Sequence, residues 1–170
     1  EKMKGNIVLI GFMGSGKTTV GKILAKELNA YFADSDQMIE EKEGMTIPDI
    51  FEKFGEAYFR ELEEATIRSI LKGDNIVVST GGGAVLNKKL FEYIKSNAKV
   101  IHLESSIDSL WNRIKNCTNR PLLYSDNPRR RMEELYKERL PIYQEAHYNV
   151  ITDNKKPIDV AREIVQILNS

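Results

Sequence analysis

Residues 6–19 read Asn-Ile-Val-Leu-Ile-Gly-Phe-Met-Gly-Ser-Gly-Lys-Thr-Thr, and this stretch decides the fold. Within it, residues 11–18 fit the phosphate-binding loop pattern G-x-x-x-x-G-K followed by Ser or Thr. The apolar run at 6–10 predicts a strand buried on both faces, and apolar residues at helical spacing predict an amphipathic helix over 17–28. A strand, a glycine turn and a helix therefore meet as the pattern requires, and the sequence predicts a binding site for a nucleoside triphosphate.

The loop supplies groups that suit a polyphosphate and its metal ion. Its glycines let backbone N–H groups turn toward phosphate oxygens, and the helix dipole adds positive potential at the same point. Lys17 can reach the terminal phosphates and Thr18 can bind Mg²⁺. The alternative is a glycine-rich turn with a surface lysine. The residues expected to contact the nucleotide here are Gly14, Ser15, Gly16, Lys17, Thr18 and Thr19.

Length and composition exclude several classes of protein. The 170 residues suffice for one domain with a sizeable core, and 25 basic side chains balance 25 acidic ones. Because no global charge field results, we expect neither nucleic acid nor a membrane surface as the main partner. One cysteine, Cys117, excludes an internal disulfide framework and fits a reducing compartment. There is no long apolar run and no room for a targeting peptide before the first strand, so we expect a cytoplasmic protein. We also expect a monomer, because no large apolar face is left over once helices cover the sheet.

Strand-like and helix-like segments alternate along the chain, which is typical of a parallel sheet with helices on both faces. Strands are expected at 6–10, 31–33, 75–79, 99–103 and 148–152. Helices are expected at 17–28, 47–54 (capped by Thr46), 57–72, 88–97, 106–116, 128–146 and 157–169. Two stretches, 34–63 and 117–127, interrupt the alternation. In a phosphotransferase such an insert can shape a second-substrate pocket and an arginine-bearing loop can close over it; a solvated surface loop is the alternative for 117–127.

Further candidate residues follow the predicted strands at their carboxyl ends, the usual ligand crevice of a parallel sheet. Alternation would direct the carboxylates of Asp34 and Asp36 the same way, toward Mg²⁺ and a substrate hydroxyl; a helix N-cap cluster is the alternative. The glycine triplet, residues 81–83, either lets the backbone approach a ligand closely or forms a structural turn. Four arginines could bind an anion: Arg60, Arg113, Arg120 and Arg139. The alternative for any one of them is a solvated surface side chain.

The two histidines add no catalytic signal. His102 lies in an apolar strand pattern and is expected to be a packed side chain, and His147 follows a helix and is expected to cap it.

Taken together, these motifs closely resemble those of shikimate kinases, small members of the nucleoside monophosphate kinase branch of the phosphate-binding-loop proteins. The resemblance covers essentially the whole chain, residues 3–170. It is carried by Gly11-Phe-Met-Gly-Ser-Gly-Lys-Thr-Thr19, Asp34-Ser-Asp36, Gly55-Glu-Ala-Tyr-Phe-Arg60 followed by Glu63, Ser79-Thr-Gly-Gly-Gly83, Arg120-Pro-Leu-Leu123 and Arg139-Leu-Pro-Ile-Tyr143. It implies a single α/β domain, a three-layer fold with a five-stranded parallel sheet of order 2-3-1-4-5, a shikimate-binding subdomain near 34–63 and a mobile lid near 115–127.

The resemblance also implies roles at the acceptor end of the site. Asp36 would hold ring hydroxyls of shikimate, including the attacking one, and is the candidate base. Arg60 and Arg139 would clamp the carboxylate, since a guanidinium fork matches a carboxylate bidentately. The backbone of Gly81, Gly82 and Gly83 would line the same pocket.

At the nucleotide end, the resemblance puts Lys17 on the phosphates, Thr18 on Mg²⁺ and Asp34 on that ion through water. Arg120 would move in with the lid toward the transferring phosphate. Residues that would flank the adenine are Arg113 and, in the loop 153–157, Lys155 and Pro157.

The implied reaction is transfer of the ATP γ-phosphoryl group to the 3-hydroxyl of shikimate, a step of chorismate and aromatic amino acid biosynthesis. A gluconate or nucleoside monophosphate kinase shares the first motif but would be expected to lack the combination of Asp36, Arg60, the glycine triplet and Arg139. A nucleotide-dependent switch would be expected to carry a guanine-reading motif such as N-K-x-D, which this sequence does not contain.

Overall fold

The structure of the chain is a computed structural model that describes residues 5–115 and 125–170. Five parallel strands form one sheet in the order β2-β3-β1-β4-β5, which confirms the predicted order. The strands are β1 (Asn6–Ile10), β2 (Tyr31–Asp34), β3 (Ile76–Ser79), β4 (Lys99–Glu104) and β5 (Tyr148–Ile151). All five lie within a residue of their expected bounds.

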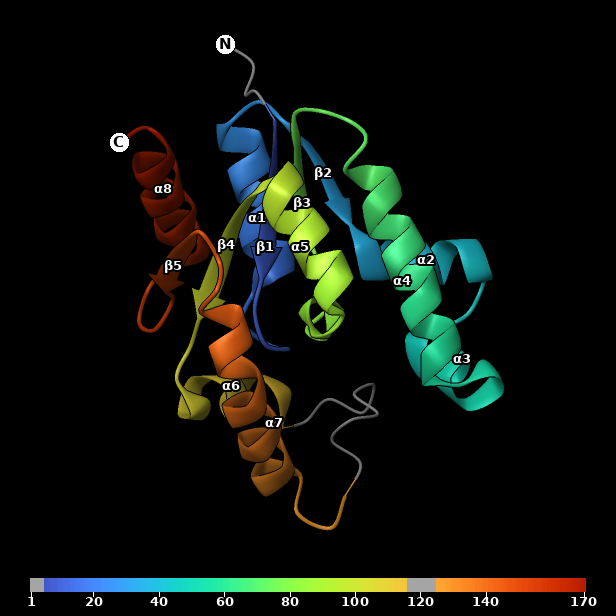
Figure 1. The fold of residues 1–170 in the computed structure, drawn as a ribbon. Helices are drawn as coiled ribbons and strands as arrows, with labels where there is room; N and C mark the ends of the chain where they lie inside the picture. Colours follow the sequence, from blue (N-terminus) through green and yellow to red (C-terminus); the bar gives the residue numbers. More distant parts are fainter. Residues whose placement is uncertain (1–4, 116–124) are drawn as a thin grey trace.

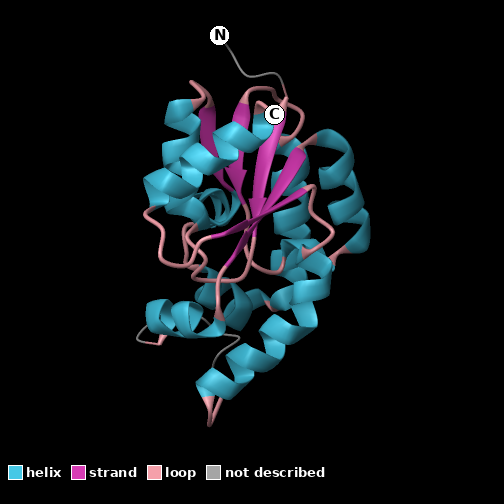
Figure 2. Cartoon of the chain, turned by 90° about the vertical axis from the view of Figure 1, so that its left-hand side faces the viewer, coloured by secondary structure: helices cyan, strands magenta, loops and turns pink. Residues whose placement is uncertain are grey.

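Helices cover both faces of the sheet and produce three layers (Figures 1 and 2). Helices α1 (Lys17–Glu27) and α8 (Pro157–Leu168) cover one face. The other face carries α4 (Glu56–Ile70), the short 3-10 helix η1 (Ala84–Leu86), α5 (Lys88–Asn97), α6 (Ile107–Ile114) and α7 (Pro128–Tyr143). None of the helices within the described ranges is long and apolar enough to cross a membrane.

The central strand β1 is buried on both faces, as its unbroken apolar run predicts. Ile7 and Leu9 pack into the core shared with α1 and α8, while Val8 and Ile10 pack into the core shared with α4, α5 and α7. This double burial fixes the position of β1, and with it the loop that follows.

The insert after β2 contains a helix that the sequence prediction missed. The expectation that strand alternation continues through Asp36 is wrong, because α2 (Ser35–Glu43) begins directly after β2. Asp34 is its N-cap, with a side chain that accepts a hydrogen bond from the Gln37 backbone at 3.1 Å. The next helix, α3 (Ile47–Phe54), is capped by Thr46 as expected. A small cluster of Ile39, Ile50 and Phe59 joins α2, α3 and α4.

Two smaller expectations also need correction. Helix α7 ends at Tyr143 rather than residue 146. His147 does not cap it: its Nδ1 accepts a hydrogen bond from the Val100 backbone N–H at 2.9 Å and so ties the start of β5 to β4. Of the stretch 117–127, residues 117–124, which include Arg120 and Cys117, lie outside the described residues.

Candidate active site

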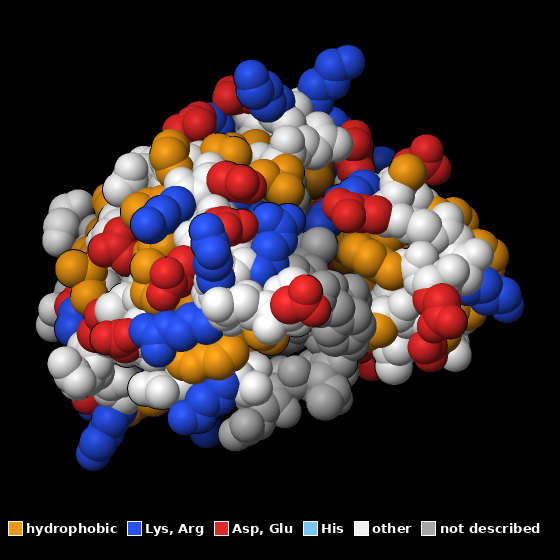
Figure 3. All heavy atoms as spheres, turned by 90° about the horizontal axis from the view of Figure 1, so that it is seen from below, with side chains coloured by type: hydrophobic (Ala, Val, Ile, Leu, Met, Phe, Trp, Pro, Cys, Tyr) orange, Lys and Arg blue, Asp and Glu red, His pale blue; other side chains and the backbone are white. Residues whose placement is uncertain are grey.

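Two adjoining cavities lie at the carboxyl end of the sheet, where β1, β2 and β3 end. The first, here called the loop cavity, is lined by the β1–α1 loop, and the second, here called the insert cavity, is lined by α2, α3 and α4. Figure 3 views the molecule from below, the end that carries these loops, and acidic and basic side chains are interspersed over that face. The residues that both cavities share are Met13, Asp36, Glu40, Gly81 and Gly82.

The backbone of the loop cavity depends on glycine. Gly14 and Gly16 have φ angles of 82° and 89°, which L-amino acids with side chains rarely adopt. A Cβ on Gly14 would also lie 2.6 Å from Cγ2 of Ile114 in α6. Gly16 caps α1 without a side-chain hydrogen bond, so the backbone N–H groups of the first helical turn face the cavity. The arrangement suits an anion.

Positive charge enters the loop cavity from two elements. The buried Lys17 donates from Nζ to the carbonyl oxygens of Gly11 at 2.6 Å and Phe12 at 3.1 Å, which holds its ammonium group against the loop. From α6, Arg113 donates to the Gly14 carbonyl at 2.8 Å and lines the same cavity. The structure therefore brings together two cations that the sequence separates by almost a hundred residues.

Oxygen ligands for a hard cation meet beside Lys17. The Thr18 hydroxyl donates to Oδ2 of Asp34 at 2.9 Å and lies 3.4 Å from the Ser79 hydroxyl. A hydroxyl and a carboxylate fit Mg²⁺, which takes few protein ligands when phosphates and water supply the others. Within the described ranges, no group of three or more His, Cys, Asp or Glu residues could hold a metal by itself.

Three expected nucleotide contacts do not line this cavity: the buried Ser15 of the β1–α1 loop, Lys155 and Pro157. Lys155 forms an ion pair with Glu163 at 3.0 Å, and Pro157 is the first residue of α8; neither lines the loop cavity. Their turn is nevertheless anchored near α6, because the Asp153 carboxylate accepts from the Ser106 backbone N–H at 3.1 Å.

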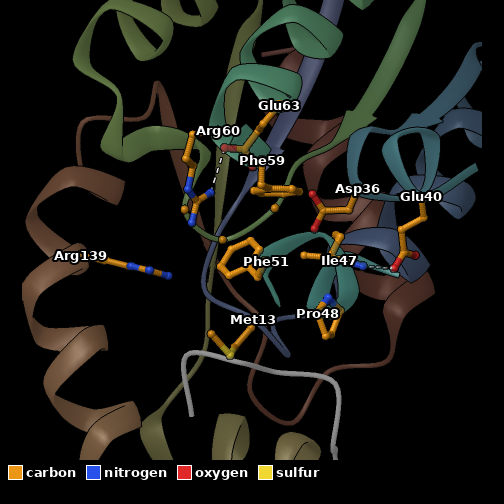
Figure 4. Close-up of a pocket in the computed structure, with 13 residues that line it drawn as sticks. Met13, Asp36, Glu40, Ile47, Pro48, Phe51, Phe59, Arg60, Glu63 and Arg139 are labelled. Carbon is orange, nitrogen blue, oxygen red and sulfur yellow. Dashed lines mark hydrogen bonds and ion pairs between the residues drawn. The ribbon is translucent and has the colours of Figure 1, made fainter. Parts of the chain in front are cut away.

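The insert cavity combines cations, carboxylates and aromatic rings (Figure 4). Arg139 extends into it from α7 and Arg60 from α4, while Asp36 faces them from α2. Arg60 donates from Nη1 to Oε1 of the buried Glu63 at 2.9 Å. The apolar residues that line the insert cavity are Met13, Ile47, Pro48, Phe51 and Phe59.

The backbone of the glycine triplet lies against three charged side chains of the insert cavity. A Cβ on Gly81 would lie 2.8 Å from both carboxylate oxygens of Asp36, and one on Gly83 would lie 2.6 Å from Nη2 of Arg60. At Gly82 the Cβ would approach Nη1 of Arg139 to 3.5 Å. None of the three has a positive φ angle, so the close approach of Asp36 to Gly81 and of Arg60 to Gly83 favours glycine at these two positions. The triplet also forms a turn, because the Ala84 N–H donates to the Gly81 carbonyl at 3.2 Å, and its approach to a ligand stays a prediction.

Burial changes the protonation of the acids in the insert cavity. It raises the pKa of Asp36 to about 6; Asp34 raises it further, and Lys17 and Arg60 oppose the shift. Burial likewise raises the pKa of Glu63 to about 7, with Arg60 opposing it and Asp36 adding to it. Oδ1 of Asp36 is buried and has no hydrogen-bond partner among the described residues. A carboxyl group that titrates near neutrality and has a vacant oxygen is suited to accept a proton.

Comparison with known proteins decides the family. A sequence model of shikimate kinase matches residues 13–169, which is nearly the whole chain. This chain belongs to the shikimate kinase family.

Individual relatives agree with this assignment. A shikimate kinase from a Sulfurihydrogenibium species is 47% identical over 160 residues, which cover 94% of this chain and 95% of the relative. The shikimate kinase of Thermodesulfovibrio yellowstonii is 44% identical and covers 95% of this chain and 93% of its own. A solved structure of shikimate kinase from Acinetobacter baumannii in complex with shikimate is 40% identical, with a TM-score of 0.95 and coverage of 99% and 94%.

Seen as a shikimate kinase, the chain has most of its predicted site residues assembled in the two cavities. Sequence reasoning missed several further lining residues: Met13, Glu40, Ile47, Pro48, Phe51, Phe59 and, as a charged wall, Glu63. Glu63 stands among the motifs that carry the resemblance but received no role; its spacing of three from Arg60 places the two on one helix face. Arg120 remains a prediction, because it lies outside the described residues.

Proposed function

We propose that this shikimate kinase family member transfers the γ-phosphoryl group of ATP to the 3-hydroxyl of shikimate, giving shikimate 3-phosphate and ADP. The observation that carries the proposal is that Asp36 stands in the wall shared by the two cavities, with phosphate-binding groups on one side and two arginines on the other. The relative that binds shikimate supports the choice of acceptor. The protein acts as a single-domain monomer in the cytoplasm.

ATP occupies the loop cavity, with its phosphates on residues 14–19. Lys17 leaves the loop carbonyls and meets the terminal phosphates, and Arg113 lies beside the nucleotide. Thr18 and Asp34 would hold Mg²⁺, Asp34 through water, and the ion would supply positive charge to the phosphate oxygens. Lys155 and Pro157 flank the adenine.

Shikimate occupies the insert cavity. Its carboxylate pairs with Arg60 and Arg139, whose guanidinium groups offer a bidentate match, and its ring lies against Phe51 and Phe59. The backbone of the glycine triplet lines the ring, close to Asp36.

Asp36 receives the proton of the attacking hydroxyl. The hydroxyl oxygen forms a bond to the γ-phosphorus, the bond from that phosphorus to the β-γ bridging oxygen breaks, and ADP leaves with the electron pair. Because such transition states are loose, alignment and positive charge supply most of the acceleration. Lys17 provides that charge from the loop, and Arg120 joins it when the lid near 115–127 closes and excludes water.

A coupled ADP-release assay with ATP and Mg²⁺ tests the proposal against shikimate, quinate, gluconate and nucleoside monophosphates. We expect turnover with shikimate and kcat/KM values at least about a hundredfold lower for the others, since each lacks a group that the cavity binds or adds one it excludes. Equal or greater use of gluconate or a nucleoside monophosphate would overturn it.

A further inference from the structure

Tyr143, the last residue of α7, contacts both the glycine triplet of the insert cavity and strand β4. Its side chain is fully buried, and its hydroxyl donates to the carbonyl oxygen of Gly82 in the glycine triplet. Its ring stacks on His102 of β4, with centroids 5.0 Å apart and an angle of 18° between planes. Neither residue lines the insert cavity.

The hydrogen bond is made to the middle residue of the glycine triplet, which lines the insert cavity. Gly82 is flanked by the glycines that contact Asp36 and Arg60, and it approaches Arg139 itself. Arg139 lies four residues before Tyr143, so the two side chains project from the same face of α7. One hydroxyl therefore links the helix that carries Arg139 to the backbone against which Asp36 and Arg60 rest.

Chemistry fixes Tyr143 as a donor in this bond. Burial raises its pKa to about 12, and the nearby Arg139 opposes the shift only in part. The phenol thus stays protonated at neutral pH, and a carbonyl oxygen can only accept.

His102 holds the ring of Tyr143 from beneath. Its Nδ1 lies 2.6 Å from Oδ1 of Asn149, its register partner on β5. Burial lowers its pKa to about 4, and Nε2 is buried and without a hydrogen-bond partner among the described atoms. Of the charged groups near it, Lys17 also opposes a positive ring. At neutral pH His102 is therefore an uncharged ring on β4 whose position is fixed by its contact with Asn149 on β5.

We propose that Tyr143 is a positioning residue for the acceptor site: it sets the distance between Arg139 and the glycine triplet, and His102 keeps its ring in place through shape and not through charge. The proposal rests on the proposed function, because the acceptor whose carboxylate meets Arg139 is shikimate.

A matched control exists seven residues earlier in the same helix. Tyr136 is also buried, and its hydroxyl also donates to a backbone carbonyl, that of Ser105 at 3.2 Å. Tyr143→Phe and Tyr136→Phe each remove one hydroxyl and leave one carbonyl without its donor. A purely structural role therefore predicts the same consequences for both variants.

Steady-state kinetics with ATP and shikimate separate the two variants. In Tyr143→Phe we expect KM for shikimate to rise about fivefold, the effect of one neutral hydrogen bond, with KM for ATP unchanged. Tyr136→Phe should leave KM for shikimate at its parental value. An unchanged KM in Tyr143→Phe, or an equal rise in both variants, would overturn the proposal.

Two further measurements extend the test, and the second of them needs no substrate. His102→Ala should raise KM for shikimate, whereas His102→Phe, which keeps a ring under Tyr143, should not; an equal rise in both would contradict the role assigned to shape. Hydrogen exchange without any substrate should accelerate at the Ala84 and Leu86 amides, which bond to the carbonyls of Gly81 and Gly83, in Tyr143→Phe alone. Equal exchange in parent and Tyr143→Phe would refute the inference even if shikimate were not the substrate.

Discussion

Replacing Asp36 by Asn should stabilise the free protein while it removes activity, because the same burial that prepares this carboxylate for proton transfer makes its charge unfavourable. Its pKa rises from the ordinary 3.8 to about 6 on folding. A shift of about two units corresponds to about 3 kcal/mol, since one unit is about 1.4 kcal/mol. The side chain is partly exposed, so we expect Asn to gain about 1–3 kcal/mol at pH 8.

The pH dependence follows from the direction of this shift. Between the unfolded and folded pKa values, the folded state binds more protons, so the stability of the parent falls as the pH rises from about 4 through about 6. The Asn side chain does not titrate, so it adds no pH dependence to the stability of the variant. The difference in stability between Asp36→Asn and the parent should therefore be complete at pH 8 and shrink as the pH falls toward 4.

Urea unfolding followed by circular dichroism at several pH values measures this difference, and the ADP-release assay measures kcat. As a control, Asp34→Ala should have the opposite sign and lose about 1 kcal/mol, because it removes the N-cap of α2. If Asp36→Asn were less stable than the parent at pH 8, or if its advantage did not depend on pH, the account of this carboxylate would be wrong.

Three other substitutions probe the two cavities. Lys17→Ala should lower kcat at least about a hundredfold with its melting curve retained, and near-parental turnover in a folded variant would exclude its contact with the phosphates. Gly83→Ala should fold, because its new Cβ meets only the flexible end of Arg60, but should raise KM for shikimate about tenfold; an unchanged KM would mean that Arg60 does not bind the acceptor. Arg139→Lys should weaken kcat/KM for shikimate by about 1.5–3 kcal/mol with KM for ATP unaffected, whereas an amide of shikimate should show little further loss in this variant. Additive losses would contradict the pairing.

The fold could be predicted from the sequence because its signals are local. The β1–α1 loop is a contiguous motif, and β1 before it is a short apolar run that is buried on both faces. Helix α2 was not predicted, because its nine residues are mostly polar and only Ser35 and Ile39 are buried, so it has no apolar periodicity. The N-cap signal at Asp34 was present, but it competed with the interpretation of the same residue as the end of a strand.

The site could be predicted only in part, because motifs name residues without giving distances. The resemblance selected Arg60, Arg139 and the glycine triplet, but their contacts join chain segments that lie 23 or more residues apart. Phe51 and Phe59 follow the pattern of ordinary core residues, and nothing in the sequence shows that they face a cavity. The bond between Tyr143 and Gly82 spans 61 residues and leaves no local signal. The roles of all these residues in binding and catalysis stay predictions.

The most direct test of the central claim is ³¹P NMR of the product formed from ATP, Mg²⁺ and shikimate by the purified protein, with the phosphate position assigned through its coupling to ring protons. The account predicts one new phosphomonoester, on the 3-hydroxyl of shikimate, formed in a one-to-one ratio with ADP. ADP accompanied by inorganic phosphate, or a phosphate ester on another hydroxyl, would contradict the placement of Asp36 beside the attacking group.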